Sequence, residues 1–463
     1  MKLREPLSNP LASLIGGPRT RHRMRSLPRS ACALLWTLAI MAVANLASAA
    51  AGSLADVKTL KMERDISNIG QECISCHQVE SPGQVADWKM SRHAHAGVSC
   101  IDCHSVPKDS PMATQHETLV GTPVYISALV SPNVCGRCHV DAKKQFDSSG
   151  HFRAYHQIVP KDNLHALTNV HEGRGHPEFQ DAPKETGCMQ CHGTKIELDE
   201  NNRPTKETWP NNGMGNIYPD GATGSCTACH SRHTFDIAEA RKPSACASCH
   251  LGPDHPNIEI FNNSKHGHIF NTNSANWRWD TAPDAWEPGD YRAPTCATCH
   301  MSGIGELSVT HNVSERLYWN LWAKESKVRN STDVLSPLLG NGEEGREKME
   351  SVCNNCHSPT HTKNFFAQGD KAVMLYNDAY YKPATAMLNE LKEKKLLKDN
   401  PWTDPFQIKY YYLWHHEGRR ARQGAMMGAP DYAHWHGFFE LQQDLYELEQ
   451  IHAKRLETGK IED

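Results

Sequence analysis

The sequence has little of what builds an ordinary hydrophobic core. Only 38% of its 463 residues are hydrophobic and the mean hydropathy is -0.62, although the chain is long enough for two to four domains. After the first 49 residues no run is apolar enough to span a bilayer, and the part that bears most of the cysteines shows no sustained strand alternation. We therefore expect something other than side chains to fill part of the interior.

A surplus of positive charge is confined to the N-terminus. Seven basic residues precede Ala31, an apolar run continues to Ala44, and Ala47-Ser48-Ala49 follow, which predicts a signal peptide over 1–49 and an exported, periplasmic protein. A retained membrane anchor is the alternative. The leader holds seven of the 49 basic and one of the 53 acidic residues, so the remaining chain has 42 Lys and Arg against 52 Asp and Glu, a formal charge of -10. This balance argues against nucleic acid and favours a basic electron-acceptor cytochrome or quinone-linked protein as partner.

Cysteine, by contrast, is abundant and regularly spaced. Sixteen of the 17 cysteines fall into eight C-x-x-C-H motifs, and the remaining one, Cys32, lies in the predicted leader. In chain order the motifs are Cys73, Cys76 and His77; Cys100, Cys103 and His104; Cys135, Cys138 and His139; Cys188, Cys191 and His192; Cys226, Cys229 and His230; Cys246, Cys249 and His250; Cys296, Cys299 and His300; and Cys353, Cys356 and His357.

This spacing predicts covalently attached haem. Two thiols three residues apart can bond the two vinyl groups of one porphyrin, and the adjacent histidine then reaches the iron from the same side. Structural zinc would not need a histidine after every second cysteine, and eight disulfides across two residues would be strained and would close almost no loop. We therefore expect eight haem c groups, whose apolar porphyrins account for the shortage of hydrophobic side chains.

The histidine supply allows most of the irons to be bound on both sides. Of 28 histidines, eight belong to the motifs and one lies in the leader, which leaves 19. Three share the pattern Ser-x-His and are predicted as second axial ligands: His93, His151 and His266. Further candidates are His165, His171, His176, His233, His311 and His361, then His116, His156 and His436. The count alone leaves open whether every iron is six-coordinate, as in an electron carrier, or one is free for substrate, as in an enzyme.

The chain changes character at about Val313. We expect haems one to three in a domain over 50–180, haems four to seven in a catalytic region over 181–312, and haem eight in a helical domain over 313–463. Helical periodicity marks 407–426 and 430–456, and the glycine-free run 370–398 has one proline, Pro383, which should begin or kink a helix. The predicted fold is mainly α, with a loop-rich haem lobe, long C-terminal helices and little β-sheet.

These motifs resemble the octahaem hydroxylamine oxidoreductase family, which also includes hydrazine dehydrogenase and reductive relatives. The resemblance covers most of the chain after the leader. It rests on the eight motifs and on three further segments: Ser225–His233 (SCTACHSRH), Leu251–Pro256 (LGPDHP) and Trp414–Arg422 (WHHEGRRAR).

The resemblance implies that the haem of the fourth motif is catalytic and open on one side. It implies an Asp-His pair over that iron, for which Asp254-His255 is the candidate, with His255 accepting protons near its ordinary pKa of about 6.5. It also implies a homotrimer in which a tyrosine from a neighbouring subunit is bonded to the catalytic porphyrin. Tyr432 is the candidate, with Tyr410, Tyr411 and Tyr412 as rivals.

The implied reaction is the oxidation of hydroxylamine to NO or nitrite, with seven haems bound by two histidines draining the electrons. A reductive nitrite or hydroxylamine reductase and a hydrazine dehydrogenase are the enzymatic alternatives. A non-enzymatic electron carrier is the third possibility, and it predicts that every iron has two protein ligands.

Overall fold

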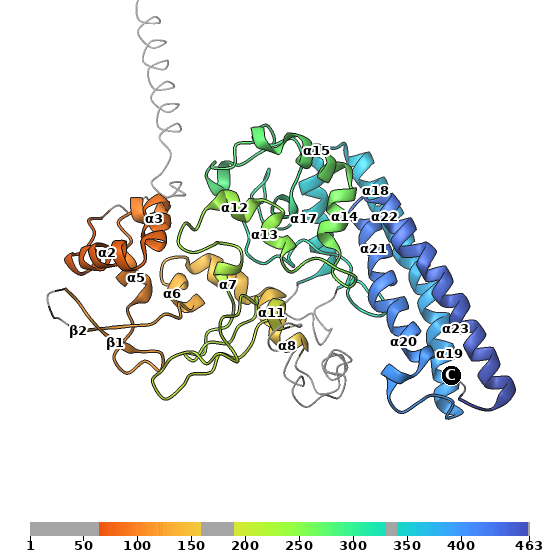
Figure 1. Ribbon diagram of the computed structural model, residues 1–463. Helices are drawn as coiled ribbons and strands as arrows, with labels where there is room; N and C mark the ends of the chain where they lie inside the picture. Colours follow the sequence, from red (N-terminus) through yellow and green to blue (C-terminus); the bar gives the residue numbers. More distant parts are fainter. Residues whose placement is uncertain (1–63, 120, 122, 159–188, 330–339, 462–463) are drawn as a thin grey trace, which may run out of the picture. The chain divides into compact units, whose positions relative to one another are not determined.

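The first half of the chain is built from short helices joined by loops. The computed structural model describes residues 64–119, 121, 123–158, 189–329 and 340–461 (Figure 1). The helices described before residue 159 are α2 (Asn68–Glu80), α3 (Pro82–Met90), α4 (Arg92–His95), α5 (Cys100–His104), α6 (Pro132–Gly136), α7 (Val140–Asp147), η2 (His151–Arg153) and α8 (Ala154–Ile158). Most of them are two turns or fewer, too short to be stable in isolation. Their order must therefore come from tertiary contacts.

One small sheet lies among these helices. Strand β1 (Thr114–Glu117) pairs antiparallel with β2 (Pro123–Ile126), with Thr114 opposite Ile126. It is the only sheet in the described part of the chain, so the prediction of a mainly α fold with little β-structure is confirmed.

The middle of the chain continues in the same style. Its elements are α11 (Met189–His192), η4 (Cys226–Ala228), α12 (Ile237–Arg241), α13 (Ser244–Ala247), α14 (Asn257–Asn263), α15 (Lys265–Asn273), η5 (Ser274–Asn276), η6 (Pro283–Ala285) and α16 (Cys296–His300). Buried polar side chains support the loops between them. Arg241, for example, is 5% exposed, donates to the carbonyl oxygens of Trp279 and Thr281 at 2.5 and 2.7 Å, and stacks over the Trp286 ring. Such bonds satisfy loop carbonyls that would otherwise be buried without a partner.

The last third consists of longer helices. They are α17 (Gly342–Asn354), α18 (Pro359–Leu375), η7 (Tyr376–Tyr381), α19 (Lys382–Glu393), η8 (Pro401–Thr403), α20 (Pro405–Tyr412), η9 (Leu413–Glu417), α21 (Gly418–Met426), α22 (Pro430–Ala433), η10 (His434–Phe438) and α23 (Phe439–Thr458). The helices predicted over 407–426 and 430–456 are both present. Helices α19, α20 and α23 contact one another (Figure 1).

Three of these helices contain a π-helical turn, at η7, η9 and η10. A π-turn holds one extra residue and rotates the helix face that follows it. In the first case the π-turn ends at Tyr381, two residues before Pro383, whose nitrogen cannot donate a backbone hydrogen bond. The proline prediction is thereby confirmed, since Pro383 lies in the first turn of α19.

The packed hydrophobic core of the described residues lies between these helices. Its fully buried members include Leu391, Leu441 and Leu448, which come from α19 and α23. Leu441, Leu445 and Leu448, which recur at helical period, form the buried stripe of α23. Trp435 and Phe439 stack on each other 5.3 Å apart but are 55% and 43% exposed, because η10 turns them away from that core.

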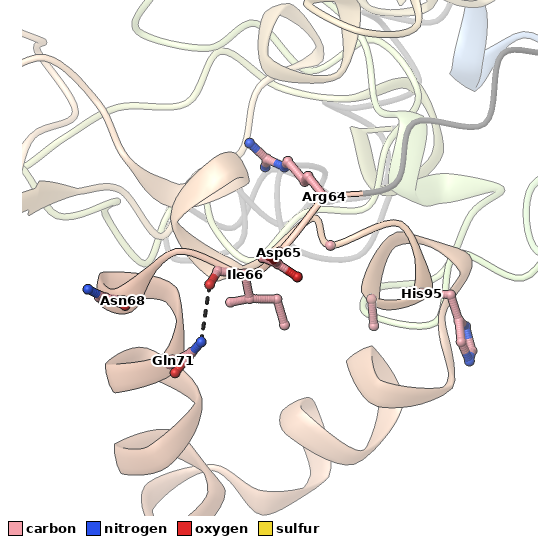
Figure 2. A pocket seen from close by; sticks show the side chains of 8 residues that line it. Arg64, Asp65, Ile66, Asn68, Gln71 and His95 are labelled. Atoms are coloured by element: carbon pink, nitrogen blue, oxygen red, sulfur yellow. Dashed lines mark hydrogen bonds between the residues drawn. The ribbon is translucent and has the colours of Figure 1, made fainter.

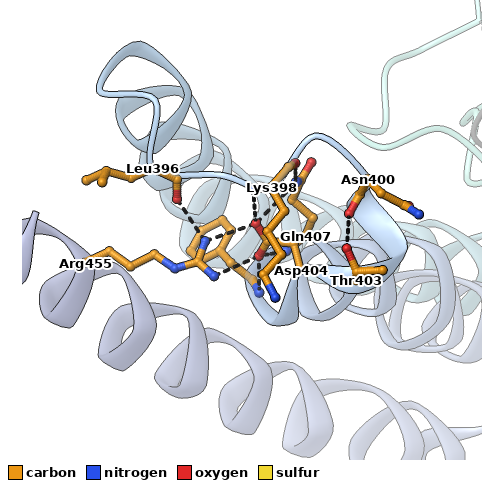
Figure 3. Close-up of polar contacts among 8 residues, drawn as sticks. Leu396, Lys398, Asn400, Thr403, Asp404, Gln407 and Arg455 are labelled. Atoms are coloured by element: carbon orange, nitrogen blue, oxygen red, sulfur yellow. Dashed lines mark hydrogen bonds and ion pairs between the residues drawn. The ribbon is translucent and has the colours of Figure 1, made fainter. Parts of the chain in front are cut away.

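A buried ion pair joins the C-terminal part of α23 to the start of α20 (Figure 3). Arg455 of α23 donates to both carboxylate oxygens of Asp404 at 3.0 and 3.1 Å, and to the carbonyl oxygen of Leu396 at 2.9 Å. Asp404 also caps α20 by accepting from the backbone N–H of Phe406 at 2.9 Å. The side chains of the pair are 1% and 0% exposed, so this bond joins three segments without water.

All described residues belong to a single compact unit, Glu63–Asp463. The predicted boundary at 180/181 lies outside the described residues, as does the predicted signal peptide, and both stay predictions. None of the helices in the described ranges is both long and apolar enough to cross a membrane.

Candidate haem centres and active site

The haem-attachment motifs sit on short helical turns. Motif one lies inside α2, motif two forms α5, motif seven forms α16, and motif eight begins in the last turn of α17; the other motifs begin or end in α6, α11, η4 and α13. A helical turn brings the two cysteines and the histidine of a motif onto one side. The fifteen motif cysteines that the structure describes are all free of disulfide bonds, as thioether attachment requires. Cys188, the first cysteine of motif four, lies outside the described residues.

Seven of the eight motif histidines face a second histidine. The distances between ring centres fall in a narrow range. The pairs are His77 and His116 at 6.2 Å, His104 and His233 at 6.3 Å, His139 and His93 at 6.0 Å, His192 and His255 at 6.0 Å, His230 and His311 at 6.5 Å, His250 and His151 at 6.1 Å, and His357 and His266 at 6.1 Å.

This spacing fits a metal between two imidazoles. A histidine nitrogen lies about 2 Å from a bound metal and its ring centre about 1 Å further, so two opposite ligands have ring centres about 6 Å apart. Direct ring stacking would bring the centres closer. The thiols and paired imidazoles therefore fit haem c in donor type and in separation.

The Ser-x-His pattern has a structural reason. Ser91 and Ser264 are buried N-cap residues whose hydroxyls accept from Ala94 N–H and Gly267 N–H, both at 3.1 Å. Ser149 likewise accepts from Phe152 N–H at 3.4 Å. The cap starts a helix two residues before the histidine and so places its ring in the first turn, where it faces a motif histidine. His93, His151 and His266 lie as this pattern suggests.

The remaining ligand candidates divide into three groups. His233 and His311 each face a motif histidine, and so does His116, whose position on β1 gives no local sequence signal. His361 stacks flat on His357 at 4.5 Å, beside it and not across from it, and His436 contacts Tyr432 at 4.8 Å and no motif histidine. The others lie elsewhere: His156 is exposed next to Tyr155, and His165, His171 and His176 lie outside the described residues.

His300 of motif seven differs from the other motif histidines. Within the described ranges no second histidine ring faces it, and burial lowers its pKa to about 4. Two buried arginines, Arg316 and Arg329, are its charged neighbours, and each has an Nε atom without a hydrogen-bond partner among the described residues. Other nitrogens of both groups donate to backbone carbonyl oxygens, and the remaining Nε–H of each is a donor that fits a haem propionate.

Hydrogen bonds orient several motif histidines. Nδ1 of His192 lies 2.9 Å from the Ala154 carbonyl oxygen, and Nδ1 of His104 lies 2.8 Å from that of Ser127. A carbonyl oxygen only accepts, so Nδ1 carries the proton and Nε2 is left to bind iron.

Asp254 and His255 lie opposite His192, as the resemblance implies. Nδ1 of His255 is 2.9 Å from an Asp254 carboxylate oxygen, and the His255 ring lies 6.0 Å from His192 and 4.7 Å from Trp322. The pair occupies the turn between motif six and α14. His255, a group that can hold a proton, therefore reaches the fourth motif from another segment of the chain.

Arg419 of α21 supports this pair from behind. Its guanidinium donates to the carbonyl oxygen of Trp322 at 2.9 and 3.1 Å and to that of Asp254 at 3.3 Å. Burial alone would raise the pKa of Asp254, but the His255 hydrogen bond and the charges of His255 and Arg419 outweigh it and hold that pKa below its usual value. Asp254 is therefore a carboxylate, able to hold the Nδ1 proton of His255.

The Tyr432 side chain is buried against residues of its own chain. It is 9% exposed, packs against Ile260 of α14 and against Met427, and burial raises its pKa to about 12. Of its rivals, Tyr410 and Tyr411 are also buried, whereas Tyr412 is 37% exposed and stacks on His416 at 4.9 Å.

Neighbouring motifs can be ordered through their cysteines. The thiols of three cysteine pairs lie next to each other: Cys135 and Cys226, Cys191 and Cys249, and Cys246 and Cys296. Motif three is thus next to motif five, and motif six lies between motifs four and seven. Haems at motifs four, six and seven would therefore be neighbours.

A separate hollow of about 570 Å³ lies beside motif one (Figure 2). It is lined by Arg64, Asn68 and Gln71 at the start of α2 and by His95 at the end of α4. Asp254, His255 and the fourth motif take no part in it, so the hollow is not the candidate active site.

Comparison with known proteins identifies the class. The family described as seven times multi-haem cytochrome CxxCH matches residues 220–403, and the cytochrome c554 and c-prime family matches residues 37–105 and 134–231. Together with the paired histidines, these matches make the chain a multihaem c-type cytochrome that binds haem c covalently.

Within that class the relatives are hydroxylamine-oxidoreductase-like. A probable nitrite reductase-hydroxylamine oxidoreductase fusion protein of Kuenenia stuttgartiensis is 28% identical over 62% of this chain. The match covers 34% of that protein, so the chain spans about a third of the curated relative's length. The resemblance predicted from the sequence is confirmed.

Two solved structures share the fold. A hypothetical multiheme protein matches with a TM-score of 0.71 at 23% identity, over 87% of this chain and 99% of its own. A reducing HAO-like protein complex of Kuenenia stuttgartiensis matches with a TM-score of 0.56 at 18% identity, over 84% and 86%.

Proposed function

We propose that this protein is a multihaem redox enzyme that converts a small nitrogen compound at the haem of the fourth motif. The observation that carries the proposal is the Asp254–His255 pair facing His192. Eight haem c groups, one for each motif, would be bound, and the other seven would carry electrons. Bound haem iron supplies a coordination site for nitrogen ligands and exchanges electrons one at a time.

The residues around His192 suit proton handling. Reduction of nitrite or hydroxylamine consumes protons, and oxidation of hydroxylamine releases them. His255 can hold or release one at Nε2 while Asp254 fixes the opposite nitrogen. Trp322 covers one face of His255 and partly shields it from water. Arg419 positions both Asp254 and Trp322 through their carbonyl oxygens.

Reduction is the direction we favour. In the family that the sequence resembles, oxidation depends on a tyrosine supplied by a neighbouring subunit, and Tyr432 is packed into its own chain. The names of the fusion relative and of the reducing complex agree with this choice. Nitrite and hydroxylamine are therefore the proposed substrates.

Hydroxylamine oxidation is the second candidate. Tyr412 favours it, because this tyrosine is 37% exposed and so is accessible to a neighbouring subunit of a homotrimer, while its ring stacks on His416. Intact-mass analysis separates the two directions, since a tyrosine–porphyrin bond removes hydrogen atoms from the haem-loaded chain.

The proposed location and electron-transfer partner rest on the distribution of charge along the chain. An exported protein with a cleaved leader would meet a basic electron carrier, which the negative formal charge of the remaining chain attracts. A quinone-linked protein is the other proposed partner.

The test is an assay of the haem-loaded protein in both directions. A reduced dye serves as donor for nitrite and hydroxylamine, and an oxidised cytochrome serves as acceptor for hydroxylamine. Replacing His255 by Ala or Asp254 by Asn should lower the rate about 10²-fold or more, as loss of general acid-base catalysis does. His452→Ala is the control, because His452 pairs with Glu390 on α19, among the C-terminal helices. Wild-type rates in both site variants, or no turnover of either compound by the wild type, would contradict the proposal.

A further inference from the structure

The pair His192 and His255 has the same spacing as the six other pairs. Its ring centres are 6.0 Å apart, and the others lie between 6.0 and 6.5 Å. Spacing alone therefore does not distinguish the proposed active site from sites where both imidazoles bind iron.

That spacing leaves no room for a substrate. A nitrogen ligand about 2 Å from a metal, followed by a hydrogen bond of about 3 Å to His255, would place the two ring centres about 9 Å apart. The observed value is about 3 Å shorter. An iron bound by His192 would instead lie within bonding distance of the His255 ring.

Asp254, the hydrogen-bond partner of His255, also supports binding of iron by the His255 ring. Histidines that bind metals usually donate their other ring N–H to a carboxylate or a carbonyl oxygen, which fixes the ring and strengthens its donor nitrogen. Nδ1 of His255 lies 2.9 Å from Asp254 in this arrangement, which leaves Nε2 for the metal.

The local backbone allows His255 to move. His93, His151 and His266 each follow a buried serine that starts a helical turn, and they are held by that cap. His255 instead lies in a turn that contains Gly252 in a left-handed conformation (φ +84°), and its side chain is 25% exposed. It is anchored mainly through the Asp254 side chain, and the Asp254 carbonyl is held in turn by Arg419.

We infer that His255 is a displaceable axial ligand of the fourth haem. It caps the iron in the resting protein and leaves when a nitrogen substrate binds. In this exchange one iron–nitrogen bond to His255 breaks and one to the substrate forms, no electron is transferred, and the released Nε2 becomes free to take up a proton. The inference rests on the proposed function, since it explains how a site with this spacing admits a substrate.

The first test is spectroscopic. Electron paramagnetic resonance and magnetic circular dichroism of the oxidised, haem-loaded full chain count low-spin and high-spin irons. At rest we expect the haem of motif four to be low-spin, so the candidate for a high-spin iron is the haem of motif seven, whose His300 faces no second histidine ring in the described ranges. Added nitrite or hydroxylamine should change the signal of one low-spin haem. A high-spin count that is the same in the wild type and in His255→Ala would overturn the inference.

Variants identify the ligand. His255→Ala should convert one haem to high spin, and added imidazole should return it to low spin. Asp254→Asn, which weakens the donor but keeps the shape, should give a partial high-spin signal. The matched control is His452→Ala, because His452 pairs with Glu390 on α19 and with no motif histidine. It should leave the spin count as in the wild type.

The outcomes separate this inference from the proposed function. If His255→Ala creates a high-spin haem but no nitrogen compound perturbs the wild type, His255 is a permanent ligand and displacement is wrong. If the wild type reduces nitrite and His255→Ala adds no high-spin haem, the enzyme function stands and the capping role fails. If neither compound is turned over in either direction, the function itself fails, whatever the spin count.

Discussion

The residues 64–329, here called the motif region, and the residues 340–461, here called the helical region, are stabilised in different ways. Buried hydrophobic residues of the motif region form small clusters, such as the one around Ile196 and Tyr218, and its helices are short. The helical region carries only the eighth motif and has one large cluster around Leu391 and Leu441. The motif region therefore depends on its porphyrins for apolar area, whereas the helical region depends on its own side chains.

The largest effect should follow from removing a haem attachment in the motif region. In Cys296→Ala/Cys299→Ala, no porphyrin can be bonded to α16, the helix that contacts α12 and α17. Burial raises the pKa of the Cys299 thiol to about 12, which marks an enclosed position. The loss should be comparable with the whole net stability of an ordinary protein, about 5–15 kcal/mol.

We expect little haem-loaded protein from this variant, measured by haem per chain and by protease resistance. Cys138→Ala, which alters an exposed attachment in motif three, is the milder counterpart. Seven haems and wild-type unfolding in the double variant would show that the motif region does not depend on its porphyrins.

A smaller effect should follow from breaking the ion pair of the helical region. Arg455→Met leaves the Asp404 carboxylate buried without its partner and should cost about 3–5 kcal/mol in the free energy of unfolding. Burial alone would raise the pKa of Asp404, but the bonds from Arg455 and Lys398 outweigh it and lower that pKa. The contribution of the pair is thus complete above the unfolded pKa of about 3.9 and is lost as the pH falls through the lower folded value.

Urea unfolding of Arg455→Met and wild type at several pH values measures this. Their difference should shrink on acidification below about pH 4. The control is Lys382→Met, which breaks the exposed pair with Asp378 and should leave stability unchanged. A difference that is independent of pH would disprove the electrostatic explanation.

A cavity in either region comes next in size. Leu391→Ala removes a side chain that is 0% exposed in the large cluster and should cost about 2–5 kcal/mol. Ile196→Ala, in a small cluster of the motif region, should fall at the lower end of that range. Thermal unfolding followed by circular dichroism compares them, and an equal cost would remove the distinction between the two regions.

The smallest effect should come from losing a helix cap. Ser358→Ala removes the hydroxyl that accepts from His361 N–H at the start of α18, and about 1 kcal/mol is expected. Ser264→Ala removes the equivalent bond at α15 and should also alter the low-spin signal of the haem between His266 and His357. An unchanged spectrum would mean that the cap does not position His266.

The sequence predicts the haem attachments and the C-terminal helices well, because both depend on local spacing. The buried stripe Leu441, Leu445 and Leu448 has helical period, and the class of cytochrome follows from C-x-x-C-H alone. The pairing of Asp254-His255 with His192 came only from the family resemblance.

Contacts between residues far apart in the sequence could not be predicted in the same way. His116 faces His77 from a strand that brings it back across 39 residues, and no short pattern encodes that return. Arg419 reaches Asp254 across 165 residues, so its positioning role becomes visible only in the fold. Helical periodicity also does not predict that Trp435 is exposed, because η10 adds a residue to the turn.

The π-turn η9 determines which way Arg419 faces. Forcing Leu413–Glu417 into ordinary α-helix without removing a residue would rotate everything after it by about 100°. Arg419 would then leave Trp322 and Asp254 even though its own residue type had not changed. An insertion that is harmless in a surface loop would have the same effect in this helix, so the number of residues before Arg419 matters to the proposed active site as much as their types do.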